Sequence, residues 1–347
     1  MRTVWWEKGK VILINQKKLP EEVVYVECED YHRVAVSIKT LEIRGAPAIG
    51  VAAAMALALA MNKSCATSRY ALHKELTQAA DVIKATRPTA RNLFWAVERI
   101  LRKAESIEGD VREAVEGIVK EAIAMAEEDV AANKAMGTHG AMLLEDGDVV
   151  GTICNAGRLA TAGEYGTALG VIKVAHEQGK KISVIALETR PVLQGARLTA
   201  FELMQDGIDV KVICDGAIGY MFYKGMIDKF ICGADRILVT DDCYVINKVG
   251  THTVSLVAKQ YGVPFYVAAP LSTFDFKLGL GEVEIEERDS REVTNIGGRR
   301  IVPHGVSVLN PAFDITPPEF VSAIITERGV IRPPFKTNLK NILPKTP

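Results

Sequence analysis

Cys154 and Asp235 of this 347-residue sequence each combine a reactive side chain with a position at the end of an apolar strand. Cys154 ends the run DVVGTIC, and the glycine-rich turn NAGRLATAG then leads into the helical pattern EYGTALGVIKVAHEQ. A thiol near a helix N-terminus can have a lowered pKa and act as a base or a nucleophile. A buried and inert cysteine is the commoner case, and this stretch alone favours it.

The second reactive residue is Asp235, which follows the apolar run KFIC and lies between Ala234 and Arg236. A carboxyl group held in apolar surroundings has a raised pKa and can serve as a general acid near neutral pH. An ion pair with an arginine, with a structural role only, is a strong alternative. The residues alone leave both interpretations open.

Basic residues precede predicted helix starts at three places. RGAPAIG puts Arg44 beside the free N–H groups of a helix N-terminus, which suits a phosphate, although an exposed arginine is equally compatible. RPTARNLFWAV has Arg87 ahead of another helix, and here a solvated arginine is favoured. In NKVGTH, Asn247 and Lys248 precede a helix that begins near Gly250, again an arrangement suited to phosphate.

Polar residues also crowd the end of the apolar run KISVIAL, in the sequence ETRPVLQG. A proline turn there leads Gln194 and Gly195 into a helix. Such crowding at a strand end indicates a site more often than packing, although each residue singly could be a surface residue. Together, the patterns predict a phosphate-binding cleft with one thiol and one carboxyl, suited to proton transfer on a phosphorylated small molecule.

The elements that position these residues alternate between strand and helix from about residue 146. The apolar runs DVVGTIC, KISVIAL, DVKVIC, KFICGAD and PFYVAA are separated by helix-length segments. This pattern predicts an α/β fold with a mainly parallel sheet and helices on both faces. The strand-to-helix turns then lie at the carboxyl ends of the strands, where open α/β sheets bind ligands.

The preceding part of the chain is predicted to be richer in helices. TVWWEKG and KVILINQ indicate a hairpin, and EVVYVEC indicates a third strand. DYHRVAVSIKT, the alanine-rich run from Ala46 to Met61 and the amphipathic stretch from Asn92 to Met136 indicate helices. Two domains are expected for a chain of this length. The tail IRPPFKTNLKNILPKTP is expected to pack irregularly.

Composition narrows the class of protein. Charged residues make up 24% and the formal net charge is −1, which argues against a nucleic-acid partner. The longest uncharged run, from Ala46 to Met61, is too short for a membrane span, and the N-terminus lacks a secretory signal. The six cysteines form no CxxC pair and the histidines no metal-like cluster. We therefore expect no metal, no membrane contact and a reducing cytoplasm.

Eight ordered motifs closely resemble the methylthioribose-1-phosphate isomerase family. They cover residues 40 to 330 and read RGAPAIG, RPTARNLFWAV, TICNAGRLATAGEYGTALG, ETRPVLQGARLTAFEL, ICGADRI, NKVGTH, PFYVAAP and NPAFDITP. The wider family includes ribose-1,5-bisphosphate isomerases, 5-deoxyribose-1-phosphate isomerases and regulatory subunits of a translation-initiation nucleotide-exchange factor. The resemblance implies a smaller α/β domain over residues 1–135 and a Rossmann-like catalytic domain over 136–347, in a homodimer.

The resemblance also implies an activity and its residues. The activity is an aldose–ketose isomerisation in methionine salvage, acting on a sugar phosphate without metal or cofactor. The catalytic pair would be Cys154 and Asp235. The residues that would bind the substrate are Arg44, Gly45, Ala46, Arg87, Gln194, Asn247 and Lys248.

Two segments depart from the family's usual pattern. The residues after the strand DVKVIC read Asp215-Gly216-Ala217-Ile218 where the family has Asp-Asn-Met-Ala, and the segment from Leu238 to Ile246 replaces a short Asn-Gly-Asp turn. The catalytic pair is untouched, but the altered segments leave the preferred 5-substituent of the sugar open. A related sugar phosphate, or a non-catalytic regulatory role in translation, is the alternative function.

Overall fold

The computed structural model describes residues 1–87 and 90–343, and the chain divides into two compact units. The first unit contains Met1–Ala135 together with Ala156–Gly170, and the second contains Met136–Asn155 and the chain from Val171 onward. The expected boundary after residue 135 would place Ala156–Gly170 in the second domain. In the structure this segment, which closely follows Cys154 in sequence, packs within the first unit.

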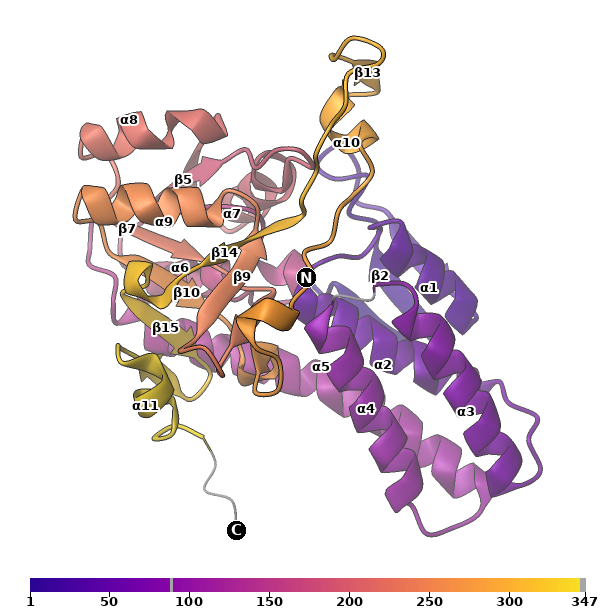
Figure 1. The fold of residues 1–347 in the computed structure, drawn as a ribbon. Helices are drawn as coiled ribbons and strands as arrows, with labels where there is room; N and C mark the ends of the chain where they lie inside the picture. The colour runs from indigo at the N-terminus through magenta and orange to yellow at the C-terminus, as the bar shows by residue number, and fades with distance from the viewer. Residues whose placement is uncertain (88–89, 344–347) are drawn as a thin grey trace. The chain divides into compact units, whose positions relative to one another are not determined.

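The first unit has the hairpin, third strand and helices that the sequence predicts (Figure 1). Strands β1, β2 and β3 form an antiparallel sheet in that order, with Val4 opposite Leu13 and Leu13 opposite Val26. The elements are β1 (Val4–Glu7), β2 (Lys10–Ile14), β3 (Tyr25–Cys28), α1 (Tyr31–Lys39), α2 (Ala46–Asn62), α3 (Arg69–Lys84), α4 (Arg91–Ser106) and α5 (Val111–Ala141), whose residues from Met136 onward belong to the second unit.

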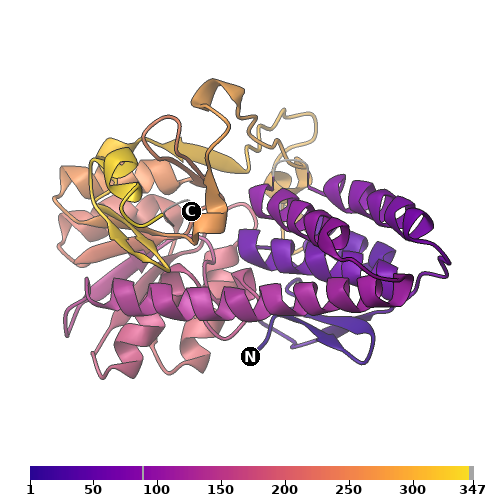
Figure 2. The same cartoon turned by 90° about the horizontal axis from the view of Figure 1, so that it is seen from below.

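Helix α2 is the buried centre of this unit. Its sequence is apolar on every side, so it has no face suited to water, and nearly all of its residues are buried. Helices α1, α3 and α4 pack against it. Helix α5 is a single uninterrupted helix of 31 residues, seen along its length in Figure 2.

The main sheet of the second unit has, among the described residues, the strand order β16-β15-β10-β7-β4-β5-β6. Its neighbouring strands are parallel except at the edge, where β16 runs antiparallel to β15. The chain enters at the central strand β4, continues outward through β5 and β6, and returns to β7 beside β4. This is the doubly wound order, with its switch point between β4 and β7. The predicted Rossmann-like α/β fold is confirmed.

Helices α8 and α9 lie side by side against this sheet (Figure 1). Beneath them, the rings of Phe230 and Phe265 stack with their centres 5.3 Å apart. The bounds of the sheet and its helices are β4 (Val149–Thr152), α6 (Ala168–Glu177), β5 (Ser183–Leu187), α7 (Ala200–Gln205), β6 (Asp209–Ile213), α8 (Ile218–Tyr223), β7 (Lys229–Cys232), α9 (Thr251–Gln260), β10 (Phe265–Ala268), β15 (Ala323–Thr326) and β16 (Gly329–Ile331).

A smaller sheet, which the sequence analysis did not predict, extends from the carboxyl end of β7. Its order is β11-β8-β9-β14, with bounds β8 (Arg236–Leu238), β9 (Tyr244–Lys248), β11 (Phe274–Asp275) and β14 (Phe313–Thr316). Two very short strands and one enclosed by prolines give little periodicity to recognise. The long connection after β11 carries α10 (Arg291–Thr294) and the hairpin of β12 (Asn295–Ile296) and β13 (Arg299–Arg300).

The expectation of an irregular C-terminal tail is partly wrong. Residues Phe335–Leu339 form the short helix α11, with the side chains of Phe335 and Leu339 fully buried. Pro334 immediately before it suits a helix start, because its missing N–H would have no helical partner there. The final residues of the tail, 344–347, lie outside the described part of the chain. Among the described residues, the helices are too short or too polar to span a membrane.

Candidate active site

The two predicted catalytic residues follow the two strands that meet at the switch point. Strands β4 and β7 are hydrogen-bonded neighbours, with Gly151 opposite Phe230. Cys154 comes two residues after the end of β4, and Asp235 comes three residues after the end of β7. Because both strands run the same way, the two residues leave the sheet at the same edge, where α/β folds of this kind bind ligands.

The backbone of Cys154 is held by hydroxyl groups from two other segments. Its φ of 63° lies in the left-handed region, which costs a residue with a Cβ about 1–3 kcal/mol. Its N–H donates to Thr189 Oγ1 at 2.8 Å, and its carbonyl accepts from Thr199 Oγ1 at 2.6 Å. These bonds hold the strained conformation, and the side chain is 7% exposed.

Asp215 in turn supports the segment that carries Thr189. Its two carboxylate oxygens accept from the N–H groups of Thr189 at 2.8 Å and Arg190 at 2.7 Å. Asp215 is the first residue of the departing segment Asp215–Ile218, so that segment keeps this support. A Cβ at Gly216, the second residue of the segment, would meet nothing within 4 Å. There is room for a Cβ at Gly216, so crowding does not explain why glycine replaces the family's asparagine there.

Gln194 is buried at the carboxyl end of β5, and its Oε1 has no hydrogen-bond partner among the described residues. Gly195 beside it begins a short π-helical turn, Gly195–Thr199. A Cβ on Gly195 would lie 1.7 Å from the carbonyl oxygen of Leu187, so only glycine fits so close to the strand end. The buried amide oxygen is the kind of group that a bound ligand satisfies.

Asp235 is half-buried at the start of the smaller sheet. Its N–H donates to the carbonyl of Ile246 at 2.9 Å, which continues the pairing of β8 with β9. The neighbouring guanidinium of Arg236 forms an ion pair with buried Asp275, with Nη1 and Oδ2 3.4 Å apart. Asp235 is therefore fixed by the same strand that carries Asn247 and Lys248.

Asn247 and Lys248 are both buried at the end of β9. Asn247 Nδ2 donates to Thr251 Oγ1 at 3.0 Å, and Lys248 Nζ donates to the carbonyl of Ala312 at 2.8 Å. The Lys248 ammonium also lies 5.3 Å from the ring centre of Phe313. Both side chains are thus held in place by residues of their own unit.

At the start of α9, where the sequence suggests a phosphate site, two amides already have an internal acceptor. The N–H groups of Gly250 and His252 donate to Asp314 Oδ2 at 2.7 and 3.1 Å. An internal carboxylate therefore already occupies the place where an anion would bind. The roles of Asp314, Thr199 and Asp215 were not predicted from the sequence. Asp314 belongs to the motif NPAFDITP, which was the one available signal.

In the first unit, Gly45 is fixed by close packing. Its φ of 96° favours glycine, and a Cβ there would lie 2.4 Å from the Cα of Ala160. Ala46 begins α2 and is buried, and Arg44 is half-buried beside it. The Arg44-Gly45-Ala46 segment therefore has the predicted geometry, with an arginine next to a helix start that lacks a side-chain cap.

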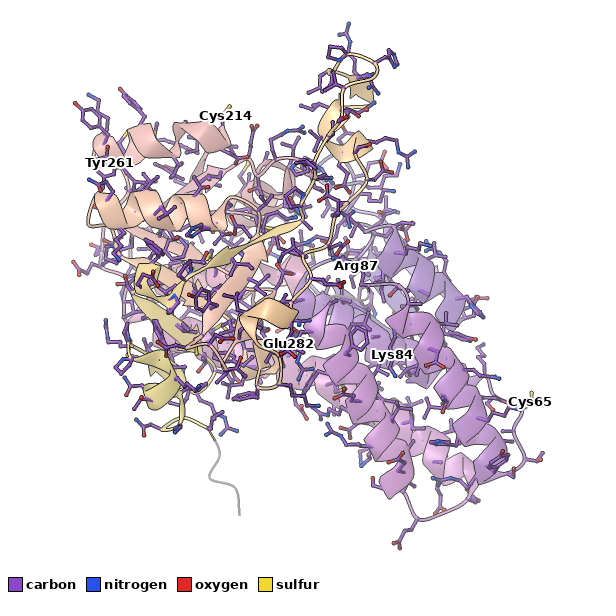
Figure 3. All side chains as sticks on the ribbon, viewed as in Figure 1. Cys65, Lys84, Arg87, Cys214, Tyr261 and Glu282 are labelled. Atoms are coloured by element: carbon purple, nitrogen blue, oxygen red, sulfur yellow. The ribbon has the colours of Figure 1, made fainter. Side chains whose placement is uncertain are left out.

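Arg87 is half-buried in the turn between α3 and α4 and is labelled in Figure 3. Its carbonyl accepts from the N–H of Ala90 at 3.1 Å. Pro88 and Thr89 of the RPTA motif lie outside the described residues. Helix α4 begins at Arg91, which agrees with an arginine that precedes a helix.

Burial changes the acidity of two further groups near Cys154. It raises the pKa of the Cys232 thiol well above its usual value, and the nearby charges of Asp314 and Cys154 act in the same direction. Burial also raises the pKa of Asp314, opposed by its bonds from His252 and Gly250. Among the described residues, no three His, Cys, Asp or Glu side chains form a group that could hold a metal ion.

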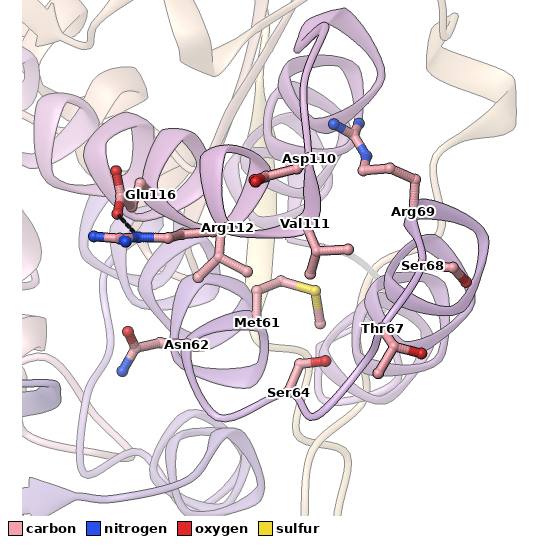
Figure 4. A pocket seen from close by; sticks show the side chains of 11 residues that line it. Met61, Asn62, Ser64, Thr67, Ser68, Arg69, Asp110, Val111, Arg112 and Glu116 are labelled. Atoms are coloured by element: carbon pink, nitrogen blue, oxygen red, sulfur yellow. Dashed lines mark hydrogen bonds and ion pairs between the residues drawn. The ribbon is translucent and has the colours of Figure 1, made fainter.

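Two hollows of the first unit contain none of the predicted site residues. One of about 710 Å³ lies among the ends of α2, α3 and α5 (Figure 4). Its polar groups are engaged: Ser68 and Asp110 cap helices, Arg69 binds backbone carbonyls, and Arg112 pairs with Glu116. The other, of about 460 Å³, is lined by Trp5, Trp6 and Tyr25 among others. Among the residues that the structure describes, neither hollow is lined by a thiol.

The model of the Initiation factor 2 subunit family matches residues 42–333. A methylthioribose-1-phosphate isomerase from Thermosipho africanus is 51% identical, over 98% of this chain and 97% of that protein. The chain belongs to the methylthioribose-1-phosphate isomerase branch of the Initiation factor 2 subunit family. The resemblance expected from the eight motifs is confirmed.

Solved structures agree with this membership. The crystal structure of 5-methylthioribose 1-phosphate isomerase from Pyrococcus horikoshii is 43% identical, covers 98% of this chain and 95% of that chain, and has a TM-score of 0.89. The crystal structure of the translation initiation factor eIF-2B, subunit delta, from A. fulgidus is 51% identical, covers 99% of both chains, and has a TM-score of 0.86. Enzymes and translation subunits of this family therefore share one fold.

Proposed function

We propose that the protein is an aldose–ketose isomerase of methionine salvage, which converts 5-methylthioribose 1-phosphate into 5-methylthioribulose 1-phosphate. The observation that carries the proposal is the position of Cys154 and Asp235 after β4 and β7, the neighbouring strands at the switch point of the parallel sheet. Relatives that carry this enzyme's name, 51% identical over nearly the full length, support the choice of reaction.

The substrate sets the chemical problem. Phosphate blocks its anomeric carbon, so the ring cannot open to a free aldehyde. In the proposed mechanism, the Asp235 carboxyl donates a proton to the ring oxygen as the bond from that oxygen to C1 breaks. The Cys154 sulfur takes the proton from C2, which leaves an enol between C1 and C2. Cys154 then delivers a proton to C1, and the C2 hydroxyl proton restores Asp235, so that the product is an isomer of the substrate.

The remaining residues bind and orient the substrate in this proposal. Arg44 and Arg87 supply guanidinium groups for the phosphate, and Gly45 and Ala46 supply backbone N–H groups at the start of α2. Gln194 contributes the buried amide oxygen that has no partner among the described residues. Asn247 and Lys248 bind the sugar phosphate from the end of β9. Holding the reacting carbons in register with Cys154 and Asp235 lowers the entropic part of the barrier.

A homodimer in the cytoplasm is proposed for the assembled enzyme. Strand β6 lies at an edge of the main sheet, and Val212 on it is exposed together with Tyr220 and Tyr223 of α8. Exposed apolar side chains and an edge strand are both compatible with a contact surface. All six cysteines are free thiols, which suits a reducing compartment. Sedimentation of the purified protein measures the oligomeric state directly.

A regulatory role in translation is the second candidate, favoured by the 51% identity to the A. fulgidus protein whose structure is described as an initiation-factor subunit. The deciding experiment assays the purified protein with 5-methylthioribose 1-phosphate, 5-deoxyribose 1-phosphate and ribose 1,5-bisphosphate. The proposal expects the highest kcat/KM with the methylthio sugar. No turnover of any sugar, with stable co-purification of initiation-factor subunits, would favour the regulatory role.

Reaction in heavy water tests the proton route. Transfer through Cys154 exposes the proton to exchange, so we expect solvent deuterium at C1 of the product. A hydride shift from C2 to C1 would carry no solvent deuterium and would leave Cys154 only a supporting role.

A further inference from the structure

Asp314 connects two segments that meet at the predicted substrate-binding residues. It lies on β14, directly opposite Asn247 in the antiparallel pairing with β9. Its Oδ2 accepts from the N–H groups of Gly250 and His252, at the start of α9. A single carboxylate oxygen thus links β14 to the turn that joins β9 to α9.

The same short segment also holds Lys248. The carbonyl of Ala312 accepts from Lys248 Nζ at 2.8 Å and from the N–H of Val249 at 3.2 Å. The ring of Phe313 lies 5.3 Å from the ammonium. Residues 312–314 therefore contact Asn247, Lys248 and the turn that follows them at several points.

The second oxygen of Asp314 decides how the residue can act. Asp314 Oδ1 is buried and has no hydrogen-bond partner among the described residues. The bonds that the structure shows for Asp314 run from Oδ2 to backbone N–H groups, so we assign its effect to the backbone that Oδ2 holds. Burial raises the pKa of Asp314, and a carboxylic acid with its proton on Oδ1 would still accept both amides through Oδ2.

The turn held by Asp314 also contacts the strand of the predicted catalytic thiol. Gly250 has a φ of 103°, and a Cβ there would lie 3.2 Å from Ile153 Cδ1, on the residue before Cys154. The turn therefore packs against the end of β4. A shift of the turn would move Asn247 and Lys248 and disturb the residue beside Cys154.

We propose that Asp314 is a positioning residue of the isomerase: it fixes the turn that directly follows Asn247 and Lys248, and it keeps the substrate's phosphate away from the amides at the start of α9. The inference rests on the proposed function for its catalytic consequence. It assigns the phosphate to the arginines and to Lys248 rather than to this helix end, because a carboxyl group already occupies the two amides.

The test compares Asp314→Ala and Asp314→Asn with Asp30→Ala. Asp30 Oδ1 accepts from the N–H of Arg33 at the start of α1, so its loss removes a helix cap of the same kind in the first unit. We expect D314A to raise KM by about 10- to 100-fold with a smaller change in kcat, because binding groups are displaced. D314N keeps an oxygen for both amides and should stay within about threefold of wild type. D30A should leave KM unchanged.

A second measurement follows the turn itself, by amide hydrogen exchange of residues 247–252. D314A should exchange faster there than wild type, and D314N and D30A should not. Exchange and KM equal to wild type in D314A would overturn the inference, as would a D314N that is folded and as impaired as D314A. Where D314A does not fold, Asp314→Glu displaces the carboxylate by one methylene, and an unchanged KM in that variant contradicts the proposal.

The two proposals fail in different ways. A wild-type protein that turns over none of the three sugar phosphates contradicts the isomerase function. The exchange measurement still decides the role of Asp314 in that case, since it reports on the turn and needs no substrate.

Discussion

Each unit has a predicted site residue with a positive φ, and the two units hold that backbone conformation by different means. In the second unit, Cys154 has a φ of 63° and is held by hydrogen bonds from Thr189 and Thr199. In the first unit, Gly45 has a φ of 96° and is held by packing against Ala160. A reactive residue needs a side chain, so the fold must compensate the strain of its Cβ. A segment that binds through its backbone can use glycine instead.

The largest expected effect is the loss of the thiol. Cys154→Ala should lower kcat by about 10²- to 10⁴-fold while KM changes little, because proton transfer is lost and the binding residues remain. Cys214→Ser is the matched control, since Cys214 is an exposed thiol of the same unit (Figure 3). Steady-state kinetics of both variants measure the difference. A C154A enzyme with nearly normal kcat would remove Cys154 from the reaction.

The packing in the first unit predicts the next effect. Gly45→Ala adds a Cβ that would overlap the backbone of Ala160 and must also adopt a positive φ. We expect a rise in KM and a loss of unfolding free energy of about 2–4 kcal/mol. Gly147→Ala has a similar φ of 89° with nothing within 4 Å, so it reports the cost of the backbone conformation alone. Equal losses in the two variants would contradict the packing argument.

The segment that packs on Gly45 predicts a pH effect on stability. Asp129 of α5 accepts from the N–H of Ala162, and burial raises its pKa to about 6 from 3.8. The folded state thus binds the Asp129 proton more tightly than the unfolded state does. The stability that this proton contributes is fully present below pH 4 and is lost as pH rises through 6. Asp129→Asn should therefore gain on wild type between pH 4 and pH 7, by at most about 3 kcal/mol. Thermal unfolding of both proteins across this range measures it, and a constant difference would refute it.

The smallest expected effect concerns the hydrogen bonds around Cys154. Thr189→Val leaves the N–H of Cys154 without its partner, which should cost about 1–3 kcal/mol of unfolding free energy and lower kcat severalfold. Thr77→Val removes a hydroxyl that donates to the carbonyl of His73 on the exposed face of α3. It should change neither the unfolding free energy nor kcat measurably. Unchanged kcat in T189V would mean that the conformation of Cys154 does not depend on this bond.

Much of the main sheet could be predicted from the sequence. The runs that became β4, β5, β6, β7 and β10 are short, apolar and separated by helix-length segments, so their pattern indicates parallel strands. Because parallel strands end at the same edge of a sheet, the polar residues that follow them lie at that edge. The smaller sheet could not be predicted, because β8 and β11 have three and two residues, and because β11 and β14 pair with strands distant in the chain.

The role of Asp314 was also beyond the sequence. Its partners Gly250 and His252 lie 64 and 62 residues earlier, and only the pairing of β14 with β9 brings them together. The bonds from Gly250 and His252 to Asp314 at the start of α9 could not be predicted for the same reason. A free helix end and an end capped by a distant carboxylate look identical in sequence. The individual roles of Cys154, Asp235 and the seven substrate-binding residues are predictions from the sequence and from its resemblance to the family.

The central claim is that chemistry takes place at the carboxyl edge of the main sheet, with Asp235 as the acid. Asp235→Asn tests it most directly, with Asp228→Asn as control, because Asp228 bonds the N–H of Val149 at the opposite, amino edge of the same sheet. The account predicts that D235N loses about 10²- to 10⁴-fold in kcat on 5-methylthioribose 1-phosphate while D228N keeps wild-type turnover. A folded D235N enzyme with nearly wild-type kcat would contradict it.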